Sequence, residues 1–500
     1  MSKQVRVRFA PSPTGPLHIG GVRTALFNYL FAKKNNGVFY LRIEDTDQNR
    51  FVPGAETYIM EALEWLGIAP SETVGKSEKF GPYRQSERKE IYKQYADQLI
   101  NSGWAYYAFD TAQDLDAQRK QHEAEGKTFI YNWHNRERLD TSLVISKEET
   151  NKRITAGVDY VIRFKTPTNE TLNLKDIIRG DINFETNLLD DKVLFKSDGM
   201  PTYHLANIVD DHLMETSHVI RGEEWLPSMP LHSLLYKAFG WEAPEFAHLP
   251  LILKPIGNGK LSKRDGDKMG FPVFPLEWET EDGISSGYRE KGFFPEAVVN
   301  FLALLGWNDG TEQEIFTLEE LCEKFDLNRV HKAGAKFDPE KNKWFNHHYL
   351  QEQTNESLAK SYLPILAEKG VSTSLDVLKI VSLIKERANF VSEFWELSDY
   401  FFIAPTLYDE KASKNWKVET PDLMRQLISV IKSIEDFNSV SIETIVKDWM
   451  SKNEIGMGKV MQPFRLSLVG ALKGPHLFDI IEVIGKEETI LRLEKAIASL

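Results

Sequence analysis

The chain has a single cysteine, Cys322, among its 500 residues. One thiol excludes an intrachain disulfide and any zinc site built from several cysteines. Cys322 lies in a helical apolar pattern, so we expect a small buried hydrophobe there rather than a nucleophile. No apolar run approaches the roughly 20 residues of a membrane helix, and residues 1–9 lack the apolar stretch of a signal peptide. We therefore expect a cytoplasmic protein with no membrane association.

A surplus of positive charge is also missing, because the formal net charge is −13 at pH 7. This balance argues against indiscriminate, histone-like binding of nucleic acid, but it leaves room for a local basic track. Hydrophobic residues make up 42% of the chain and charged residues 27%, spread without low-complexity segments. This composition is typical of a globular protein, and the length suggests about three domains.

Alternating strand and helix patterns open the chain and predict a parallel sheet. After Trp104 a charged helical stretch and β-rich segments interrupt this pattern, which indicates an insertion. The α/β pattern resumes near Thr202, and beyond about Pro295 the chain is almost wholly helical in pattern. Ser86 is expected to cap a helix that reaches about Asn101. The sequence thus predicts an interrupted α/β domain followed by a helical half.

The first motif lies between a predicted strand and a predicted helix, where a parallel sheet binds ligands. Residues 11–21 read Pro-Ser-Pro-Thr-Gly-Pro-Leu-His-Ile-Gly-Gly. Prolines stiffen such a loop, and glycines let the backbone approach a ligand closely. The N-terminus of the helix favours phosphate, and His18 can donate a hydrogen bond to a phosphoryl oxygen. A rigid turn with a surface histidine would be the simpler interpretation of His-Ile-Gly-Gly alone.

The second motif follows the strand predicted at residues 249–253. Residues 257–266 read Gly-Asn-Gly-Lys-Leu-Ser-Lys-Arg-Asp-Gly, and the glycines predict a mobile loop. Lys260 and Lys263 could hold a triphosphate and neutralise the leaving pyrophosphate. If this segment stood alone, an exposed basic hairpin would be the better interpretation.

Together the two motifs resemble the "HIGH" and "KMSKS" regions of class I aminoacyl-tRNA synthetases, in the form used by glutamyl enzymes. Gly21 replaces the second histidine of the first motif, and Leu261 and Arg264 replace methionine and serine in the second. The resemblance implies three catalytic residues: His18, Lys260 and Lys263. It implies that ATP binds at Pro11, Thr14, Gly15, His18, Gly20, Gly21, Lys260, Ser262 and Lys263.

A glutamate site needs a fixed cation for the side-chain carboxylate and an anion for the α-amino group. Arg8, Arg221 and Glu44 lie on or at the ends of predicted strands, where ligands reach the sheet edge. Taken alone, this placement suits surface ion pairs equally well. Several stretches, including residues 83–88, 198–212 and 219–225, also resemble glutamyl-tRNA synthetases. That similarity implies a glutamate site lined by Arg8, Ala10, Ser12, Glu44, Tyr203, Asn207 and Arg221.

The resemblance also implies an architecture: a Rossmann-like catalytic domain with a connective insertion, followed by an all-α anticodon-binding half. The expected parts are the first catalytic half (1–103), the acceptor-binding insertion (104–196), the second catalytic half (197–255), a stem-contact region (256–337) and the anticodon-binding region (338–500). Many bacterial relatives bind zinc through cysteines in the insertion, but residues 105–111 contain none. His122 and His134 lack a thiolate partner, so we expect no zinc and no metal ion held by the protein.

The implied activity is ligation of L-glutamate to tRNA for glutamate, with ATP and Mg²⁺, by a monomer that requires bound tRNA before it activates the amino acid. tRNA for glutamine is a further candidate substrate. The alternatives are a glutaminyl-tRNA synthetase, whose anticodon module is typically a β-barrel, and the short glutamyl-queuosine-forming paralogue, which lacks an anticodon domain. A non-catalytic tRNA-binding or nucleotidylyltransferase-like protein would leave both phosphate motifs unused.

Overall fold

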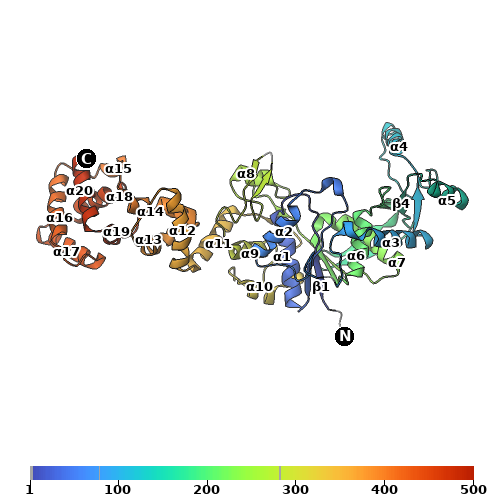
Figure 1. Cartoon of the computed structure of the whole chain (residues 1–500), viewed down its shortest axis with the longest axis horizontal. Helices are drawn as coiled ribbons and strands as arrows, with labels where there is room; N and C mark the ends of the chain where they lie inside the picture. Colours follow the sequence, from blue (N-terminus) through green and yellow to red (C-terminus); the bar gives the residue numbers. More distant parts are fainter. Residues whose placement is uncertain (1–3, 78, 281–282) are drawn as a thin grey trace. The chain divides into compact units, whose positions relative to one another are not determined.

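The computed structural model describes residues 4–77, 79–280 and 283–500. These residues form two compact units (Figure 1). Unit 1 comprises Met1–Lys291 and Val298–Pro339, and unit 2 comprises Gly292–Ala297 and Glu340–Leu500. The division between units lies close to the expected start of the anticodon-binding region. The finer division of unit 1 into four parts stays a prediction.

Unit 1 contains the parallel sheet that the sequence predicts. β1 (Arg6–Phe9) pairs in parallel with β2 (Val38–Leu41), and β8 (His218–Gly222) pairs in parallel with β9 (Glu245–Leu249). The N–H group of Ser217 donates to the carbonyl of Arg6 at 2.9 Å, which joins the two strand pairs. Helices cover this sheet (Figure 1): α1 (Ile19–Lys34), α2 (Ala55–Trp65), α3 (Lys89–Asn101), α6 (Tyr203–Leu213) and α7 (Met229–Phe239).

β1 is buried along its whole length although two of its four residues are arginines. Val7 and Phe9 face one side of the sheet, while Arg6 and Arg8 alternate with them on the other. Carboxylates neutralise both arginines, because Arg6 pairs with Glu72 at 2.9 Å and Arg8 pairs with Asp211 at 2.9 Å. A buried charge is tolerated only with such a partner.

The insertion after β2 and α3 is confirmed as a change of architecture. β3 (Ala105–Ala108) and β7 (Val193–Phe195) flank β4 (Val161–Phe164) in an antiparallel three-stranded sheet, and β5 (Thr171–Asp176) and β6 (Gly180–Glu185) form a hairpin. The hairpin also joins the parallel sheet, because Asp176 at the end of β5 pairs with Phe246 of β9. The elements of the insertion are β3 (Ala105–Ala108), α4 (Ala112–Ala124), α5 (Lys147–Thr155), β4 (Val161–Phe164), β5 (Thr171–Asp176), β6 (Gly180–Glu185) and β7 (Val193–Phe195).

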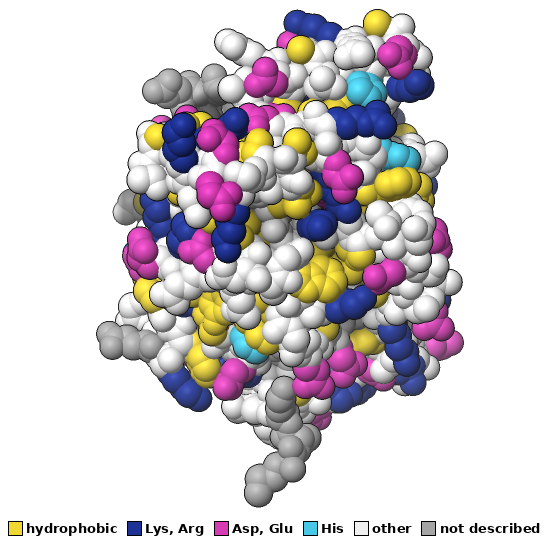
Figure 2. Space-filling model, turned by 90° about the vertical axis from the view of Figure 1, so that its right-hand side faces the viewer, with side chains coloured by type: hydrophobic (Ala, Val, Ile, Leu, Met, Phe, Trp, Pro, Cys, Tyr) yellow, Lys and Arg dark blue, Asp and Glu magenta, His cyan; other side chains and the backbone are white. Residues whose placement is uncertain are grey.

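Figure 2 shows lysines and arginines interspersed with acidic side chains on one face of the molecule.

The remainder of unit 1 mixes short strands with helices. β10 (Ile252–Leu253) and β13 (Ala335–Lys336) pair in parallel, and β11 (Trp278–Thr280) and β12 (Gly283–Ser285) pair in an antiparallel manner. The elements are β10 (Ile252–Leu253), α8 (Lys263–Met269), β11 (Trp278–Thr280), β12 (Gly283–Ser285), α9 (Pro295–Leu304), α10 (Leu318–Lys324) and β13 (Ala335–Lys336). Strand β13 is the exception to the helical pattern expected beyond Pro295.

Unit 2 is helical among its described residues, as the sequence predicts, and its core is built from apolar faces of most of its helices. Tyr362, Ile380, Phe394 and Leu427 are among its fully buried side chains. The helices are α11 (Pro339–Glu352), α12 (Asn355–Glu368), α13 (Val377–Ile384), α14 (Phe394–Phe402), α15 (Glu410–Ser413), α16 (Thr420–Lys432), α17 (Ser439–Lys452), α18 (Met457–Val469), α19 (Leu477–Ile484) and α20 (Lys486–Ser499). Among the described residues, no helix is both long and apolar enough to cross a membrane.

Two local expectations have different outcomes. Ser86 does not cap α3: its N–H and hydroxyl groups donate to Asp45 at 2.8 and 2.6 Å, and Arg88 occupies the cap position. A carboxylate far away in the sequence thus replaces the expected local partner.

Cys322 is half-buried in α10, so it is less buried than the sequence predicts. Burial raises the pKa of its thiol to about 11, so the thiol stays protonated at neutral pH, which is unfavourable for a nucleophile.

A capping box stabilises the start of α10. The Thr317 hydroxyl accepts from the N–H of Glu320 at 3.2 Å, and Glu320 accepts from the N–H of Thr317 at 2.8 Å. Replacing Thr317 with alanine should lower the free energy of unfolding of unit 1 by about 1 kcal/mol. Urea unfolding followed by circular dichroism measures this change in the free energy of unfolding. Thr155→Ala, at an exposed helix end in the same unit, is the control; equal effects of the two changes would contradict a capping role.

Candidate active site

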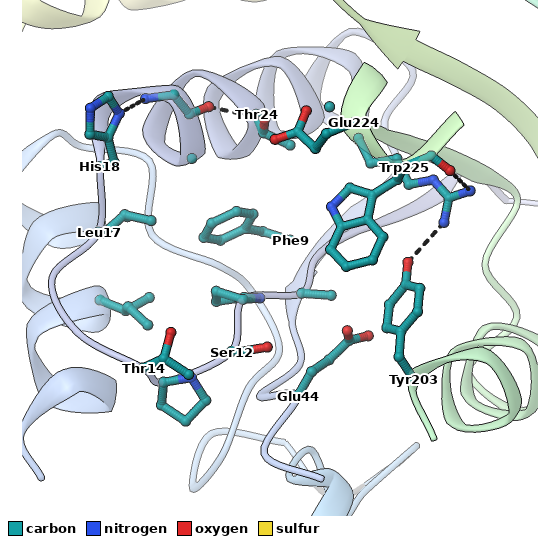
Figure 3. A pocket seen from close by; sticks show the side chains of 18 of the residues that line it. Phe9, Ser12, Thr14, Leu17, His18, Thr24, Glu44, Tyr203, Glu224 and Trp225 are labelled. Carbon is teal, nitrogen blue, oxygen red and sulfur yellow. Dashed lines mark hydrogen bonds between the residues drawn. The ribbon is translucent and has the colours of Figure 1, made fainter. Parts of the chain in front are cut away.

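An open pocket of about 1110 Å³ lies where the carboxyl ends of β1, β2 and β8 meet the N-terminus of α1. Figure 3 shows His18 at one end of this pocket, and Glu44, Tyr203 and Trp225 at the other. The pocket brings together all but two of the site residues predicted from the sequence. Those that line it are Arg8, Ala10, Pro11, Ser12, Thr14, Gly15, His18, Gly20, Gly21, Glu44, Tyr203, Asn207, Arg221 and Lys260.

His18 is the N-cap of α1, and this role fixes the tautomer of its ring. Its Nδ1 accepts a hydrogen bond from the N–H of Gly20 at 3.1 Å. The proton of a neutral ring must then be on Nε2, which is buried and has no partner in the described part of the chain. Burial, with a smaller contribution from Lys260, lowers the pKa of His18 to about 4. At neutral pH the pocket therefore contains an uncharged imidazole with one unused N–H donor.

Two glycines shape the backbone around this histidine. Gly15 has φ of +140°, which side chains disfavour, so glycine suits the tight loop between β1 and α1. A Cβ atom on Gly21 would lie 2.6 Å from Cδ1 of Leu17. Any side chain at this position would force the side chain of Leu17 to move.

A buried charge cluster lies beneath the opposite end of the pocket. Asp211 accepts from Nε and Nη2 of Arg8 at 2.9 and 3.1 Å and from Arg42 at 2.8 Å. Burial acts to raise the pKa of Asp211, but Arg8 and Arg42 outweigh it, so this pKa lies below its usual range. The buried cluster is balanced in charge and consists of Arg8, Arg42, Arg88, Glu44, Asp210 and Asp211.

Glu44 and Asn207 present two unused acceptors next to each other. Oε1 of Glu44 accepts from Arg42 at 2.9 Å and from Nδ2 of Asn207 at 3.1 Å. Oε2 of Glu44 and Oδ1 of Asn207 have no hydrogen-bond partner among residues 4–77, 79–280 and 283–500. Oδ1 of Asn207 is buried, and a buried acceptor without a donor is costly unless a ligand supplies the hydrogen.

Arg221 differs from the arginines of the cluster because its neighbours are neutral. Its side chain is 5% exposed, yet no carboxylate of the described residues lies within 4 Å of it. Nε donates to Nε2 of His248 at 3.0 Å, and Nη1 donates to the Tyr203 hydroxyl at 2.9 Å. Nη2 has one long bond, to the carbonyl of Trp225 at 3.3 Å, which leaves one N–H group for a ligand. Burying an unpaired cation is unfavourable, so this position calls for an anionic ligand.

Ser262 and Lys263 do not line the pocket, and the expected mobile loop continues into a helix. Ser262 is the N-cap of α8, and its hydroxyl donates to Asp265 at 2.6 Å. Lys263 is the first residue of that helix. Lys260 does line the pocket, and its ammonium group pairs with Glu224 at 2.8 Å. Of the two lysines, the one nearer the cleft is therefore Lys260.

The sequence reasoning missed several residues that shape the pocket. Trp225 lies with its ring 4.4 Å from that of Tyr203, and Glu224 holds Lys260. The pair Asp210 and Asp211 gave one signal that could have been used: two consecutive acids inside an otherwise apolar helical pattern point to buried ion pairs. His248, which is fully buried, gave none.

Comparisons with known proteins match this geometry. Residues 4–344 match the model of the tRNA synthetases class I (E and Q), catalytic domain, and residues 347–497 match an anticodon binding domain. The chain belongs to this family of class I tRNA synthetases. The catalytic fold of this synthetase and its helical anticodon-binding region are thereby confirmed.

Relatives of this class I synthetase match over its full length. It is 83% identical to the glutamate–tRNA ligase of Flavobacterium johnsoniae and 63% identical to that of Christiangramia forsetii, over 100% of both chains in each case. A crystal structure of a glutamate tRNA ligase from Elizabethkingia meningosepticum, in complex with its amino acid, is 55% identical, covers 100% of both chains and has a TM-score of 0.97. A glutamate–tRNA synthetase structure from Elizabethkingia anophelis has a TM-score of 0.95.

No group of three or more metal-binding side chains occurs in the part of the synthetase that the structure describes. Nδ1 of His122 lies 2.8 Å from the carbonyl of Gln118, and the ring of His134 stacks on Trp133 at 3.5 Å. Both histidines thus make the packing and surface contacts that the sequence favours. The absence of structural zinc stays a prediction.

Proposed function

We propose that this synthetase joins L-glutamate to the 3′-terminal adenosine of tRNA at the expense of ATP, as a glutamate–tRNA ligase. One observation carries the choice of glutamate: Arg221 is a buried cation without an acidic partner among the described residues, at the wall of the catalytic pocket. A glutamate side chain supplies the missing negative charge, whereas a glutamine side chain does not. The names of the full-length relatives support the same substrate.

The two ends of the amino acid fit different parts of the pocket. Oε2 of Glu44 and Oδ1 of Asn207 would accept from the α-ammonium group. Arg221 would pair with the side-chain carboxylate. Because Arg221 donates to the oxygen of Tyr203, the hydroxyl hydrogen of Tyr203 is free to donate to the same carboxylate. Asp211 accepts from Nε and from one N–H group of Nη2 of Arg8, so Nη1 and the second N–H group of Nη2 are left for substrate.

ATP would lie along the other side of the pocket. The unused Nε2–H of His18 and the N-terminus of α1 suit the α-phosphate, and Ala10, Ser12 and Thr14 border the space between the two substrates. Lys260, joined by Lys263 if the loop before α8 moves, would neutralise the leaving pyrophosphate. Mg²⁺ would enter with ATP and screen its phosphates.

The reaction then needs no protein nucleophile. The α-carboxylate of glutamate attacks the α-phosphorus of ATP, and pyrophosphate leaves with its electron pair to give glutamyl-adenylate. A hydroxyl of the terminal adenosine of tRNA next attacks the acyl carbon, and AMP leaves. The protein contributes position and charge stabilisation through His18, the lysines and the N–H groups of α1.

We further propose tRNA for glutamate as the partner of unit 2, with tRNA for glutamine as a second candidate, and a monomeric enzyme in the cytoplasm. The anticodon-binding match of residues 347–497 argues against the queuosine-forming paralogue. The helical content of unit 2 argues against a glutaminyl enzyme with a β-barrel module. A non-catalytic protein would have no use for the free hydrogen-bond donors that line the pocket.

Alanine at Lys260 or at Lys263 should lower kcat/KM for ATP by about tenfold to a hundredfold and leave the KM for glutamate unchanged. The reason is the loss of one charge-assisted contact to the phosphates. Pyrophosphate exchange at varied ATP concentration measures the effect. Lys268→Ala, in the last turn of α8, is the matched control. A glutamate-specific defect in either variant would contradict this role.

Charging of purified tRNA tests the proposed function itself. With ATP present, the chain should attach radiolabelled glutamate to tRNA, and tRNA with an oxidised 3′-terminal ribose should accept none. Attachment of glutamine instead, or of neither amino acid, would overturn the proposal.

A further inference from the structure

Two buried groups, Asp176 and His248, hold Arg221 through a chain of contacts that extends from the insertion to the pocket. Asp176 at the end of β5 contacts Nδ1 of His248 at 2.6 Å, and Nε2 of His248 contacts Nε of Arg221 at 3.0 Å. Asp176 and His248 are 1% and 0% exposed. Neither residue lines the pocket, so neither can touch substrate.

Hydrogen bonds determine which nitrogen of His248 carries the proton. Asp176 also accepts from the backbone N–H groups of Ile178, Arg179 and His248. A carboxylate surrounded by donors stays ionised and accepts from Nδ1–H. Nε2 is then bare, and it is the acceptor that the Nε–H group of Arg221 needs. The other tautomer would place two donors against each other.

We propose that Asp176 and His248 are positioning residues that orient Arg221 toward the side-chain carboxylate of the amino acid substrate. This inference rests on the proposed use of glutamate. An acceptor at Nε leaves the outer edge of the guanidinium group directed at the pocket, where Nη1 aligns Tyr203 and Nη2 keeps a free N–H group. The ring of His248 separates Asp176 from Arg221, so the carboxylate of Asp176 does not occupy a donor that the substrate requires.

Two substitutions at position 248 separate positioning from packing. In His248→Gln the amide oxygen can lie where Nε2 was and accept from Arg221. In His248→Asn the shorter side chain can still donate to Asp176 but cannot reach Arg221. His248→Asn should lower kcat/KM for glutamate by about tenfold to a hundredfold, mainly through KM. His248→Gln should stay within about fivefold of the wild type, since it keeps the bond to Arg221.

The assay is glutamate-dependent pyrophosphate exchange with tRNA present, with the KM for ATP measured in the same preparations as proof of a folded unit 1. Equal losses of glutamate use in the two variants, or an unchanged glutamate KM in His248→Asn, would overturn the positioning role alone. Failure of the wild-type chain to use glutamate would overturn the proposed function, and the positioning role with it.

Asp176→Asn provides an independent readout. Its amide oxygen can keep the backbone donors of Ile178 and Arg179, which turns the amide nitrogen toward His248 and favours the wrong tautomer. We expect a larger rise in glutamate KM from Asp176→Asn in the wild-type background than in the His248→Gln background, where no tautomer exists. An equal rise in both backgrounds would show that Asp176 acts only on the backbone and would overturn its role through His248.

Discussion

Replacing Arg221 with alanine is expected to lower kcat/KM for glutamate by about a hundredfold to several thousandfold while the KM for ATP changes little. The loss corresponds to about 3–5 kcal/mol, the usual cost of removing one partner from a buried charge pair. In this variant the carboxylate of the substrate would enter a pocket without its counter-ion. Steady-state pyrophosphate exchange with tRNA present, at varied glutamate and then at varied ATP, measures both constants.

Two further variants sharpen this prediction. Arg221→Lys keeps the charge but cannot contact His248, Tyr203 and Trp225 together, so it should recover only part of the loss. Arg84→Ala removes a half-buried arginine that pairs with Glu56 and Glu87 and does not line the pocket. It should behave as the wild type. Equal damage to the use of glutamate and ATP by Arg221→Ala would count against the assigned carboxylate site.

Replacing His18 with asparagine is expected to lower kcat by about a hundredfold to a thousandfold, because one neutral donor to the charge that develops on the α-phosphate is lost. Asparagine is a preferred N-cap, so its side-chain oxygen can still accept from the N–H of Gly20 and maintain the start of α1. The change therefore removes the Nε2–H donor while preserving the cap. Single-turnover formation of adenylate with tRNA present isolates this step.

The comparison with His18→Ala separates the two roles of His18. Alanine removes both the donor and the cap, so this variant should lose the same rate and also unfold at a lower temperature. A wild-type kcat in His18→Asn would mean that His18 only caps the helix. This result would contradict its assignment as a catalytic donor.

The sequence was most informative where function depends on short contiguous segments. Residues 11–21 predicted both the loop and the donor histidine, because a strand, a glycine-rich turn and a helix follow each other directly. Arg221 and Glu44 could be placed at the sheet edge because parallel strands bring their carboxyl ends together. The helical half was predictable from apolar periodicity alone.

The sequence was least informative where partners are distant along the chain. Arg8 and Asp211 are 203 positions apart, and Asp176 and His248 are 72 apart. No local pattern pairs such residues, so Arg8 could be predicted as a site residue while its neutralisation by Asp211 could not. Ser86 shows the same limit. Local preference suggested that it caps a helix, but its hydroxyl donates to a carboxylate distant in the sequence.

The central claim is that a buried, unpaired Arg221 selects a negatively charged amino acid. Pyrophosphate exchange with glutamate or glutamine as the only amino acid, each with and without tRNA, tests it most directly. With tRNA present, kcat/KM for glutamate should exceed that for glutamine by about a hundredfold or more, since the amide leaves the guanidinium group unpaired, and exchange without tRNA should be weak. Comparable exchange with the two amino acids, or faster exchange with glutamine, would contradict the account.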